Sequence, residues 1–496
     1  MQRRNDFYGS ASLYLYFFKS YTKIMSSAES SKKNEKFIKM TATPVEKLIM
    51  GLALPSITIM IISSLYNMAD TYFVSSLGTS QVAAVGIAFP VMFIIQAMGF
   101  FFGQGSGNYM SRALGAQDTE NASRMAATGF ISSFIVMALI AVGGILCLSP
   151  LVDGLGATES IRPHAKDYLL YIFLASPWMV SATVLNQQLR FQASASIAMT
   201  GMLTGAILNI FLDPLFIFVL KMGVPGAAIA TMLSQIVSFF ILLCYGCTRK
   251  GNIPIKLYHF SPSIARYIEM FRGGVPALLR QSLMSIATII INQFAKGYGD
   301  AAIAAISIVN RICMFANSVV LGFGQGYQPV CGFNYGAKLY SRVRKGFWFC
   351  VKICCAGLLF IVVFLLIFAP QIIALFRKDD PAVIAIGARG LRLNCISLPF
   401  MAGVVMCNMM TQTMGKAFQA SVVALARQGL CLIPCLFILG PLSGLLGIQL
   451  ATPVSDMISL AIVVPIMIKV LKDLSVPDGT DTGSAEAAKT EIVDID

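Results

Sequence analysis

Charged residues are scarce in this sequence, and their scarcity decides the class of protein. Asp, Glu, Lys and Arg make up 12% of the 496 residues, whereas 56% are hydrophobic and the mean hydropathy is +0.74. A soluble domain carries about a quarter charged residues, so a soluble protein is excluded. The long apolar runs Ile131–Leu148 and Ile353–Ala369 do not alternate with polar residues, which excludes a transmembrane barrel. We therefore expect an all-α, polytopic membrane protein.

Histidine is almost absent, and the motifs of metal, redox and nucleotide chemistry are missing. With only two His, the sequence offers few ligands for a haem or zinc centre. The 12 Cys lie mostly inside apolar runs, where they act as small hydrophobic residues. The C-x-x-C pair Cys244 and Cys247 has no second pair nearby. Without a G-x-x-x-x-G-K-[ST] loop, ATP coupling within the chain is not expected. We predict no cofactor and no enzymatic activity, since no clustered His and no nucleophile with its base are present.

The formal net charge of +14 is spread through the connections between apolar runs. Basic residues in that arrangement act as topology signals, so no nucleic-acid partner is expected. Lys and Arg number 25 on the side that holds both tails and 7 on the opposite side. The positive-inside rule then predicts cytoplasmic termini. No cleavable signal peptide is evident, and the short loops favour a bacterial inner membrane.

Apolar windows predict twelve membrane helices, arranged as two sets of six. The first set forms an N-lobe over residues 45–247, and the second forms a C-lobe over residues 272–470. A polar cytoplasmic linker, 248–271, separates them. The tails 1–44 and 471–496 are expected to be cytoplasmic and disordered. The predicted spans are 48–77, 82–107, 125–149, 167–189, 197–220, 227–247, 272–296, 302–327, 347–369, 386–410, 418–440 and 443–469.

The two halves repeat each other at an offset of 221 to 222 residues. The segment 103–105 (Gly-Gln-Gly) matches 324–326, and Gly226, Thr231 and their neighbours match Gly447, Thr452 and theirs. Because each half holds an even number of spans, both halves enter the membrane in the same orientation. This parallel repeat is typical of secondary transporters. It predicts two pseudo-symmetric six-helix lobes around a cleft that opens alternately to either side.

Acidic residues inside predicted spans mark the candidate coupling site, because a carboxylate at membrane depth costs about 2.5–3.5 kcal/mol. Asp70, Asp213 and Asp456 stand out. Asn209 and Asp213 are four residues apart and share one helix face. Pro214 removes a backbone donor and frees a carbonyl one turn back. Carboxylate and carbonyl oxygens together are typical of a proton or sodium site.

A structural role for these acids stays open, since a buried Asp held by hydroxyl or amide groups can simply join two helices. Asp456 fits this alternative best, because its repeat partner is the neutral Gln235. At the same offset Asp70 corresponds to Ile291. Coupling chemistry is therefore expected in the first half of the chain only.

The second half instead carries cations inside its helices. Arg280 is the candidate for a position in the substrate cleft, with Gln281 and Asn292 on the same predicted helix. Buried Arg is usually paired, so a structural partnership is the alternative for it and for the other three residues of this kind, Arg311, Arg392 and Arg427.

Several motifs together resemble those of the multidrug and toxic compound extrusion (MATE) transporters, in the bacterial branch of the DinF and MepA exporters. The resemblance covers residues 44–470. Its marks are 65–71 (Leu-Tyr-Asn-Met-Ala-Asp-Thr) with Gly78, 209–214 followed by 226–231, 280–282 (Arg-Gln-Ser), and 324–329 running to 334–337. One departure lies after the fourth span, where the family's Arg-Ala-Glu-Gly is replaced by Arg190-Phe191-Gln192-Ala193.

The resemblance implies an antiporter that exports organic cations, drugs or toxic metabolites in exchange for protons or sodium. It implies small-molecule substrates, and we expect a monomer in a lipid bilayer. The family's N-lobe ion site corresponds to Asp70, Asn209, Asp213 and Thr231, and Asn186 matches an Asn that many members place beside it. Sodium, if it is the coupling ion, is expected at Asp70, Asn209 and Asp213.

A flippase for lipid-linked saccharides, an activity of the same superfamily, is the alternative. A flippase should have a more basic cleft and usually more than twelve helices. The four intramembrane Arg residues keep this reading open.

Overall fold

A computed structural model describes residues 34–75, 77, 79–248, 253, 255–376, 380–475 and 478. Helices dominate these residues and no strand occurs among them, which confirms the all-α prediction. After a short helix at residues 34–42, the first half consists of α2 (Val45–Ser75), α3 (Thr79–Gly115), α4 (Thr119–Leu146), α5 (Leu148–Gly154), α6 (Arg162–Phe191), α7 (Ala195–Pro214), the π-helix η1 (Leu215–Val219) and α8 (Val224–Thr248).

The second half begins with the 3-10 helix η2 (Leu257–His259). It continues with α9 (Ile264–Lys296), α10 (Asp300–Gly336), α11 (Tyr340–Phe376), α12 (Pro381–Thr413), α13 (Ala417–Leu425), the π-helix η3 (Ala426–Cys431) and α14 (Leu432–Asp473). The described residues contain 11 helical stretches long and apolar enough to cross a membrane. The chain is therefore a multi-pass membrane protein.

The part of the chain that the structure describes has eleven apolar helical stretches, whereas the sequence predicts twelve membrane spans. A break at Gly444 explains the difference. The last stretch, Gly429–Asp473, has 45 residues, which at 1.5 Å per residue is about twice the thickness of a hydrocarbon core. Inside it Gly444 has φ 58° and ψ −137°, a backbone conformation that ends one helix and starts another. A side chain is disfavoured at this positive φ, which explains the glycine. The two segments on either side of Gly444 correspond to the last two predicted spans.

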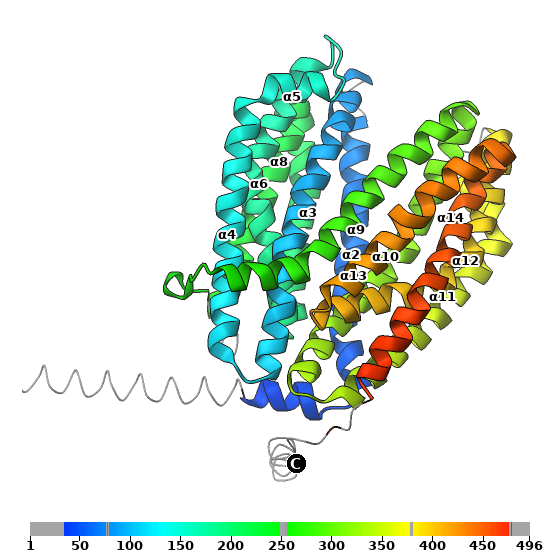
Figure 1. The fold of residues 1–496 in the computed structure, drawn as a ribbon. Helices are drawn as coiled ribbons and strands as arrows, with labels where there is room; N and C mark the ends of the chain where they lie inside the picture. The colour runs from blue at the N-terminus through cyan, green and yellow to red at the C-terminus, as the bar shows by residue number, and fades with distance from the viewer. Residues whose placement is uncertain are drawn as a thin grey trace, which may run out of the picture.

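The helices form two groups that touch at one end and diverge toward the other (Figure 1). We call α2–α8 the N-lobe and α9–α14 the C-lobe. The end where they touch holds the start of α2 and the end of α14, together with the α3–α4 and α10–α11 connections (Figure 1). We call it the closed end, and the opposite end the splayed end.

Glycines bring the lobes into backbone contact near the closed end. A Cβ at Gly105 would lie 2.4 Å from the carbonyl oxygen of Met270, and one at Gly326 would lie 2.5 Å from Cα of Ala53. These contacts join α3 to α9 and α10 to α2, so each pairs an N-lobe helix with a C-lobe helix. Small residues allow such close approach between membrane helices, where packing replaces the hydrophobic effect as the main attraction.

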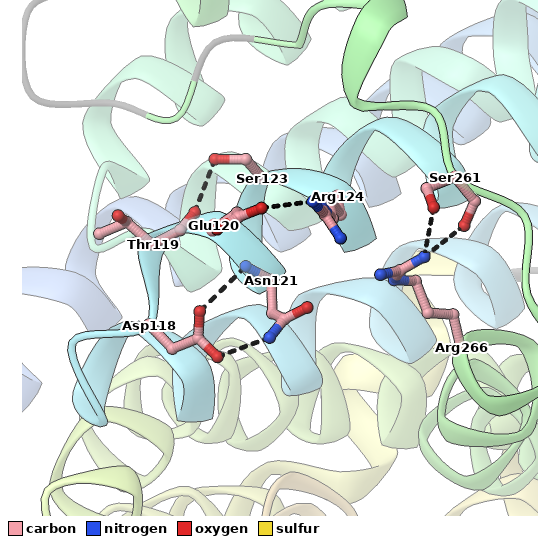
Figure 2. Close-up of polar contacts among 8 residues, drawn as sticks. All are labelled: Asp118, Thr119, Glu120, Asn121, Ser123, Arg124, Ser261 and Arg266. Carbon is pink, nitrogen blue, oxygen red and sulfur yellow. Dashed lines mark hydrogen bonds and ion pairs between the residues drawn. The ribbon is translucent and has the colours of Figure 1, made fainter.

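Two boundary predictions are wrong. Residues 264–271 were expected in the linker, but α9 already begins at Ile264, where the side chain of Ser263 accepts a hydrogen bond from the Arg266 backbone N–H at 3.4 Å. Figure 2 shows Arg266 of this first turn donating to Ser261, beside the start of α4, where Asp118 caps the helix. Arg266 and Arg272, two of the basic residues that suggested a linker, therefore belong to α9.

The expectation of a disordered N-terminal tail fails for its last residues. Residues 34–42 form a helix that lies across the closed end (Figure 1). Lys36 Nζ donates to Ser194 Oγ of the N-lobe at 2.9 Å, and Asn334 Nδ2 of the C-lobe donates to the Met40 carbonyl at 3.2 Å. Met40 is buried in an apolar cluster made mainly by α2, α10, α11 and α12. The helix therefore joins both lobes. Residues 1–33 and 479–496 lie outside the described part of the chain.

Candidate functional site

A polar cluster is buried where α7 meets α8 in the N-lobe. Asp213 is 0% exposed, and Asn209 and Thr231 are 1% exposed. Asn209 Nδ2 donates to Asp213 Oδ1 at 3.3 Å and to Thr231 Oγ1 at 3.4 Å. The structure thus brings together three of the predicted ion-site residues. Both distances are long for hydrogen bonds, so the Asn209 amide holds its neighbours loosely.

Small residues on α7 make this meeting possible. Gly201 and Gly205 precede Asn209 by two turns and one turn on the same helix face. A Cβ at Gly205 would lie 2.9 Å from Cβ of Ser238, and Ser238 Oγ donates to the Gly201 carbonyl at 3.0 Å. The two helices are therefore close enough for Asn209 to reach Thr231.

The end of α7 loosens immediately after the carboxylate. Pro214 has no N–H to donate back along the helix, and the five residues of η1 follow it as a π-helix, with Leu220 N–H bonded to the Leu215 carbonyl at 2.9 Å. Single π turns in α-helices occur often at functional sites, because the wider turn leaves backbone groups outside the regular pattern. Asp213 thus sits beside backbone that departs from the regular α-helical pattern.

Two more oxygen atoms of the cluster have unused bonding capacity. Asn209 Oδ1 and Ser234 Oγ are buried and have no hydrogen-bond partner among the residues that the structure describes. Ser234 lies one turn after Thr231 on α8 and is 1% exposed. Sequence reasoning used Ser234 only as a repeat landmark. Carboxylate, amide and hydroxyl oxygens are the ligands that hard cations prefer, so this donor set fits sodium as well as a proton.

Asp70 lies in the last third of α2, a helix that packs against α7. Its side chain lies outside the described residues, so its contact with Asp213 stays a prediction.

Asn186 is not brought to the cluster. Its Nδ2 donates to the Ala198 carbonyl at 2.9 Å, and Ala198 is eleven residues before Asn209, or about 16 Å along α7. The repeat partner Asn408 makes the same bond, to the Ala420 carbonyl at 2.8 Å. Both lobes therefore use this Asn to fasten the fourth span of the lobe to the fifth. The repetition gives Asn186 a structural explanation.

The three predicted cleft residues lie on α9. Arg280 Nη1 donates to Asn408 Oδ1 at 3.0 Å, and Gln281 Nε2 donates to Gln96 Oε1 of α3 at 3.3 Å. The second bond crosses from one lobe to the other. Asn292 is exposed, nearer to the splayed end.

Asp456 is paired, which agrees with the structural role considered as the alternative to ion coupling. Arg427 Nε lies 2.8 Å from Asp456 Oδ1, and Ser397 Oγ donates to Asp456 Oδ2 at 2.8 Å. The Asp456 side chain is 4% exposed. These bonds join α12, η3 and α14 inside the C-lobe and satisfy both carboxylate oxygens.

Arg190 was treated as part of a turn motif, but the structure buries it at 2% exposure near the end of α6. Its guanidinium contacts the side-chain oxygens of Gln187 and, across the lobes, Gln325. A cation at the end of an otherwise apolar span was the available signal. Its partner on α10 is 135 residues away and was not predictable from spacing.

Comparison with known proteins decides the family. The model of the family described as MatE matches residues 55–215 and 276–438, one match in each half. The chain belongs to the MatE family. This membership confirms the resemblance seen in the motifs, and the paired match reproduces the internal repeat.

This MatE chain matches its curated relatives over nearly their whole length. The multidrug export protein MepA of Staphylococcus haemolyticus is 29% identical over 419 residues, which cover 84% of this chain and 92% of the relative. MepA of Staphylococcus aureus strain MRSA252 is 29% identical over 425 residues, with the same coverage.

Solved structures agree with this MatE fold. An outward-facing multidrug resistance MATE transporter of the MOP superfamily superposes with a TM-score of 0.84 at 28% identity, covering 88% of this chain and 98% of that one. A MOP-superfamily transporter from Pyrococcus furiosus, described as having a binding pocket of reverse polarity, superposes at 0.83 and 28% identity, with coverages of 89% and 99%.

Proposed function

We propose that this protein is a secondary antiporter that exports drugs, toxic metabolites or organic cations in exchange for entering protons or sodium ions. The observation that carries the proposal is the fully buried Asp213, held beside Asn209 and Thr231. A carboxylate at this depth is expensive unless a proton or a cation neutralises it. Multidrug export by the MepA relatives supports the same function.

Binding of the ion changes what the N-lobe can do. With a proton or sodium on Asp213, the cluster is neutral and α7 can stay packed on α8. When the ion leaves, the charged carboxylate requires water or a new partner, and the flexible turn at Pro214 and η1 allows α7 to adjust. An ion that binds one lobe conformation better than the other shifts the equilibrium toward it. Ion release and cargo movement are coupled in this way.

Orientation follows from charge. The excess of Lys and Arg on the side of both termini supports a cytoplasmic closed end, and the short loops support a bacterial inner membrane as the location. In that orientation the described conformation opens outward, ready to release cargo and take up an ion. Return to the inward-open form requires the glycine contacts at the closed end to separate.

The test measures efflux of a fluorescent organic cation from proteoliposomes under separately imposed proton and sodium gradients. Asp213→Asn should abolish gradient-driven efflux and leave cargo binding detectable. Asp153→Asn is the matched control, because Asp153 is about half exposed at the end of α5 and pairs there with Arg162 at 2.5 Å. Full gradient-driven efflux by Asp213→Asn would refute the coupling site.

A flippase is the second candidate, and the arginines of α9 and α10 are the observation that favours it. The same liposomes, loaded with a fluorescent lipid-linked saccharide, test it. Gradient-independent movement of that lipid, without efflux of the organic cation, would reject the antiporter function and support the flippase function.

A further inference from the structure

A buried polar seam lies where the two lobes meet near the closed end. It consists of Gln104 of α3, Arg190 of α6, Gln325 of α10 and Gln412 of α12, none of which is more than 3% exposed. The guanidinium of Arg190 crosses from the N-lobe to contact Gln325 of the C-lobe. Gln325 is eleven residues, or about 16 Å, before the end of α10. The seam therefore lies between the splayed end and the side of the membrane that the closed end faces.

The internal repeat relates these four residues as two pairs. Gln104 corresponds to Gln325 at an offset of 221, and Arg190 corresponds to Gln412 at an offset of 222. Gln412 Nε2 donates to the Gly273 carbonyl at 2.6 Å, and a Cβ at Gly273 would lie 3.4 Å from the Gln104 carbonyl oxygen. Gln412 thus reaches the part of α9 that packs on Gln104, as Arg190 reaches Gln325. At one of the two equivalent positions the chain has an amide, and at the other it has a cation.

The positive charge of Arg190 lies beside neutral partners. Its guanidinium contacts the side-chain oxygens of Gln187 and Gln325, which carry no charge. Its Nε is buried and has no hydrogen-bond partner among the residues that the structure describes. Arg keeps its proton in proteins, and burial of a charge is costly. Because the repeat places Gln412 at the equivalent position, the cation indicates a role that an amide would not fill.

The amides beside this charge give the seam unused hydrogen-bonding groups. Neither polar side-chain atom of Gln104 has a partner within the described part of the chain, and the same holds for Gln328, one turn after Gln325 on α10. Gln412 Oε1 also has none there. Buried amides of this kind bind water. The seam therefore offers protons and small cations a polar route across the contact between the lobes.

We propose that Arg190 is an electrostatic barrier that keeps protons and other cations from crossing the closed end while the lobes touch there. This inference rests on the proposed antiport and deepens it, because a gradient drives export only if its ions do not pass without cargo. A fixed positive charge raises the energy of every cation near it, and channels exclude protons and cations in this way. Gln325 holds the guanidinium at the lobe contact, so the barrier is in place while the closed end is shut.

The experiment measures proton leak in the absence of cargo, in proteoliposomes that contain the full-length protein. A potassium gradient with valinomycin sets the membrane potential, and entrapped pyranine reports proton entry. Arg190→Gln introduces the residue that the repeat has at position 412, and it should raise the proton leak about tenfold. That is the effect of one unit charge on a cation about 12 Å away at an effective dielectric constant of about 20.

Two further variants keep a positive charge at the seam and should leak as little as the unmodified protein. Arg190→Lys retains the charge at the same position. Arg124→Gln is the matched control, since Arg124 is exposed on α4 and pairs within its own helix with Glu120. A leak of Arg190→Lys as large as that of Arg190→Gln would contradict a barrier of charge.

Gln325→Glu separates an electrostatic barrier from a mechanical lock. The new carboxylate has the shape of the amide and pairs with Arg190, so it strengthens the contact between the lobes and cancels the charge. A barrier of charge predicts a raised proton leak in this variant, whereas a lock predicts a lowered one. Permeation of erythritol, followed by liposome swelling, should be the same in all variants, because a fixed charge does not act on a neutral solute.

An unchanged proton leak in both Arg190→Gln and Gln325→Glu would overturn the inference. A rise in erythritol permeation that matches the rise in proton leak would also overturn it, since that indicates a loosened contact. Each variant is repeated with Asp213→Asn, which removes the proposed coupling carboxylate. The raised leak should persist there, and a leak that disappears passes through the coupling site and rejects the barrier. Failure of the antiporter is seen separately, as absent gradient-driven efflux by the unmodified protein, and leaves the leak comparison intact.

Discussion

Arg112 of α3 and Glu269 of α9 form an ion pair of 3.0 Å that joins the two lobes at the closed end. Arg112 also donates through Nη1 to the Thr413 carbonyl at the end of α12, at 2.7 Å. One N-lobe side chain thus holds two helices of the C-lobe. In the proposed transport cycle the lobes separate here, so we expect the pair to act as a latch.

Weakening the latch should favour opening of the closed end. We expect Glu269→Gln to cost the closed conformation about 1 kcal/mol, the upper range for a partly exposed ion pair. Electron spin resonance distances between labels at Thr119 and Lys338, one in each lobe, should show an added population of longer distances. Glu120→Gln, which breaks an exposed pair within α4, is the control and should leave the distances unchanged. The same distance distribution in both variants would contradict the latch.

The glycine contacts between the lobes should also be sensitive to substitution. Gly326→Ala places a Cβ 2.5 Å from the backbone of Ala53, so the helices must move apart, at a cost of about 1–3 kcal/mol. Gly51→Ala is a matched control on α2, because its added Cβ has nothing within 4 Å among the described residues. Thermal unfolding in detergent should show a lowered midpoint for Gly326→Ala. Gly51→Ala should be neutral or slightly stabilising. Equal midpoints for the two variants would argue against backbone contact between α2 and α10.

Asp456 should behave as a structural residue. Asp456→Asn leaves the partly exposed guanidinium of Arg427 without its counter-charge, which we expect to destabilise the protein by about 1–3 kcal/mol. Replacing both residues, Arg427→Met with Asp456→Leu, should recover most of the stability. Gradient-driven efflux by the stable double variant should be retained. If that variant folds but no longer couples transport to an ion gradient, Asp456 belongs to the coupling site after all.

The N-terminal helix should stabilise the closed end. Deletion of residues 1–43 removes the contacts of Lys36 with Ser194 and of Met40 with Asn334, and it exposes the pocket that Met40 fills. We expect a lowered unfolding temperature and increased proteolysis at the α3–α4 connection. Deletion of residues 1–33 is the control, because it keeps the helix at residues 34–42 and all of these contacts. Identical behaviour of the two truncated proteins would show that the helix contributes nothing.

Hydropathy and internal repetition were sufficient for most of the fold. In lipid a backbone must satisfy its own hydrogen bonds, so long apolar runs have little choice but to form helices. The i, i+4 spacing of Asn209 and Asp213 was equally informative, because a helix places such residues on one face whatever surrounds it. Boundaries failed where polar residues belong to helices that extend beyond the apolar run, as at Ile264 and at residues 34–42.

The contacts that define how this MatE chain works were decided by tertiary structure alone. Arg112 pairs with Glu269, which is 157 residues away in the sequence. Asn186 donates to the Ala198 carbonyl and does not join the cluster around Asp213. Arg280 of α9 bonds to Asn408 of α12, which is 128 residues away in the sequence. Local spacing determines which face of a helix a side chain occupies. Which helix that face meets depends on the packing of all the helices together, and no local pattern encodes it.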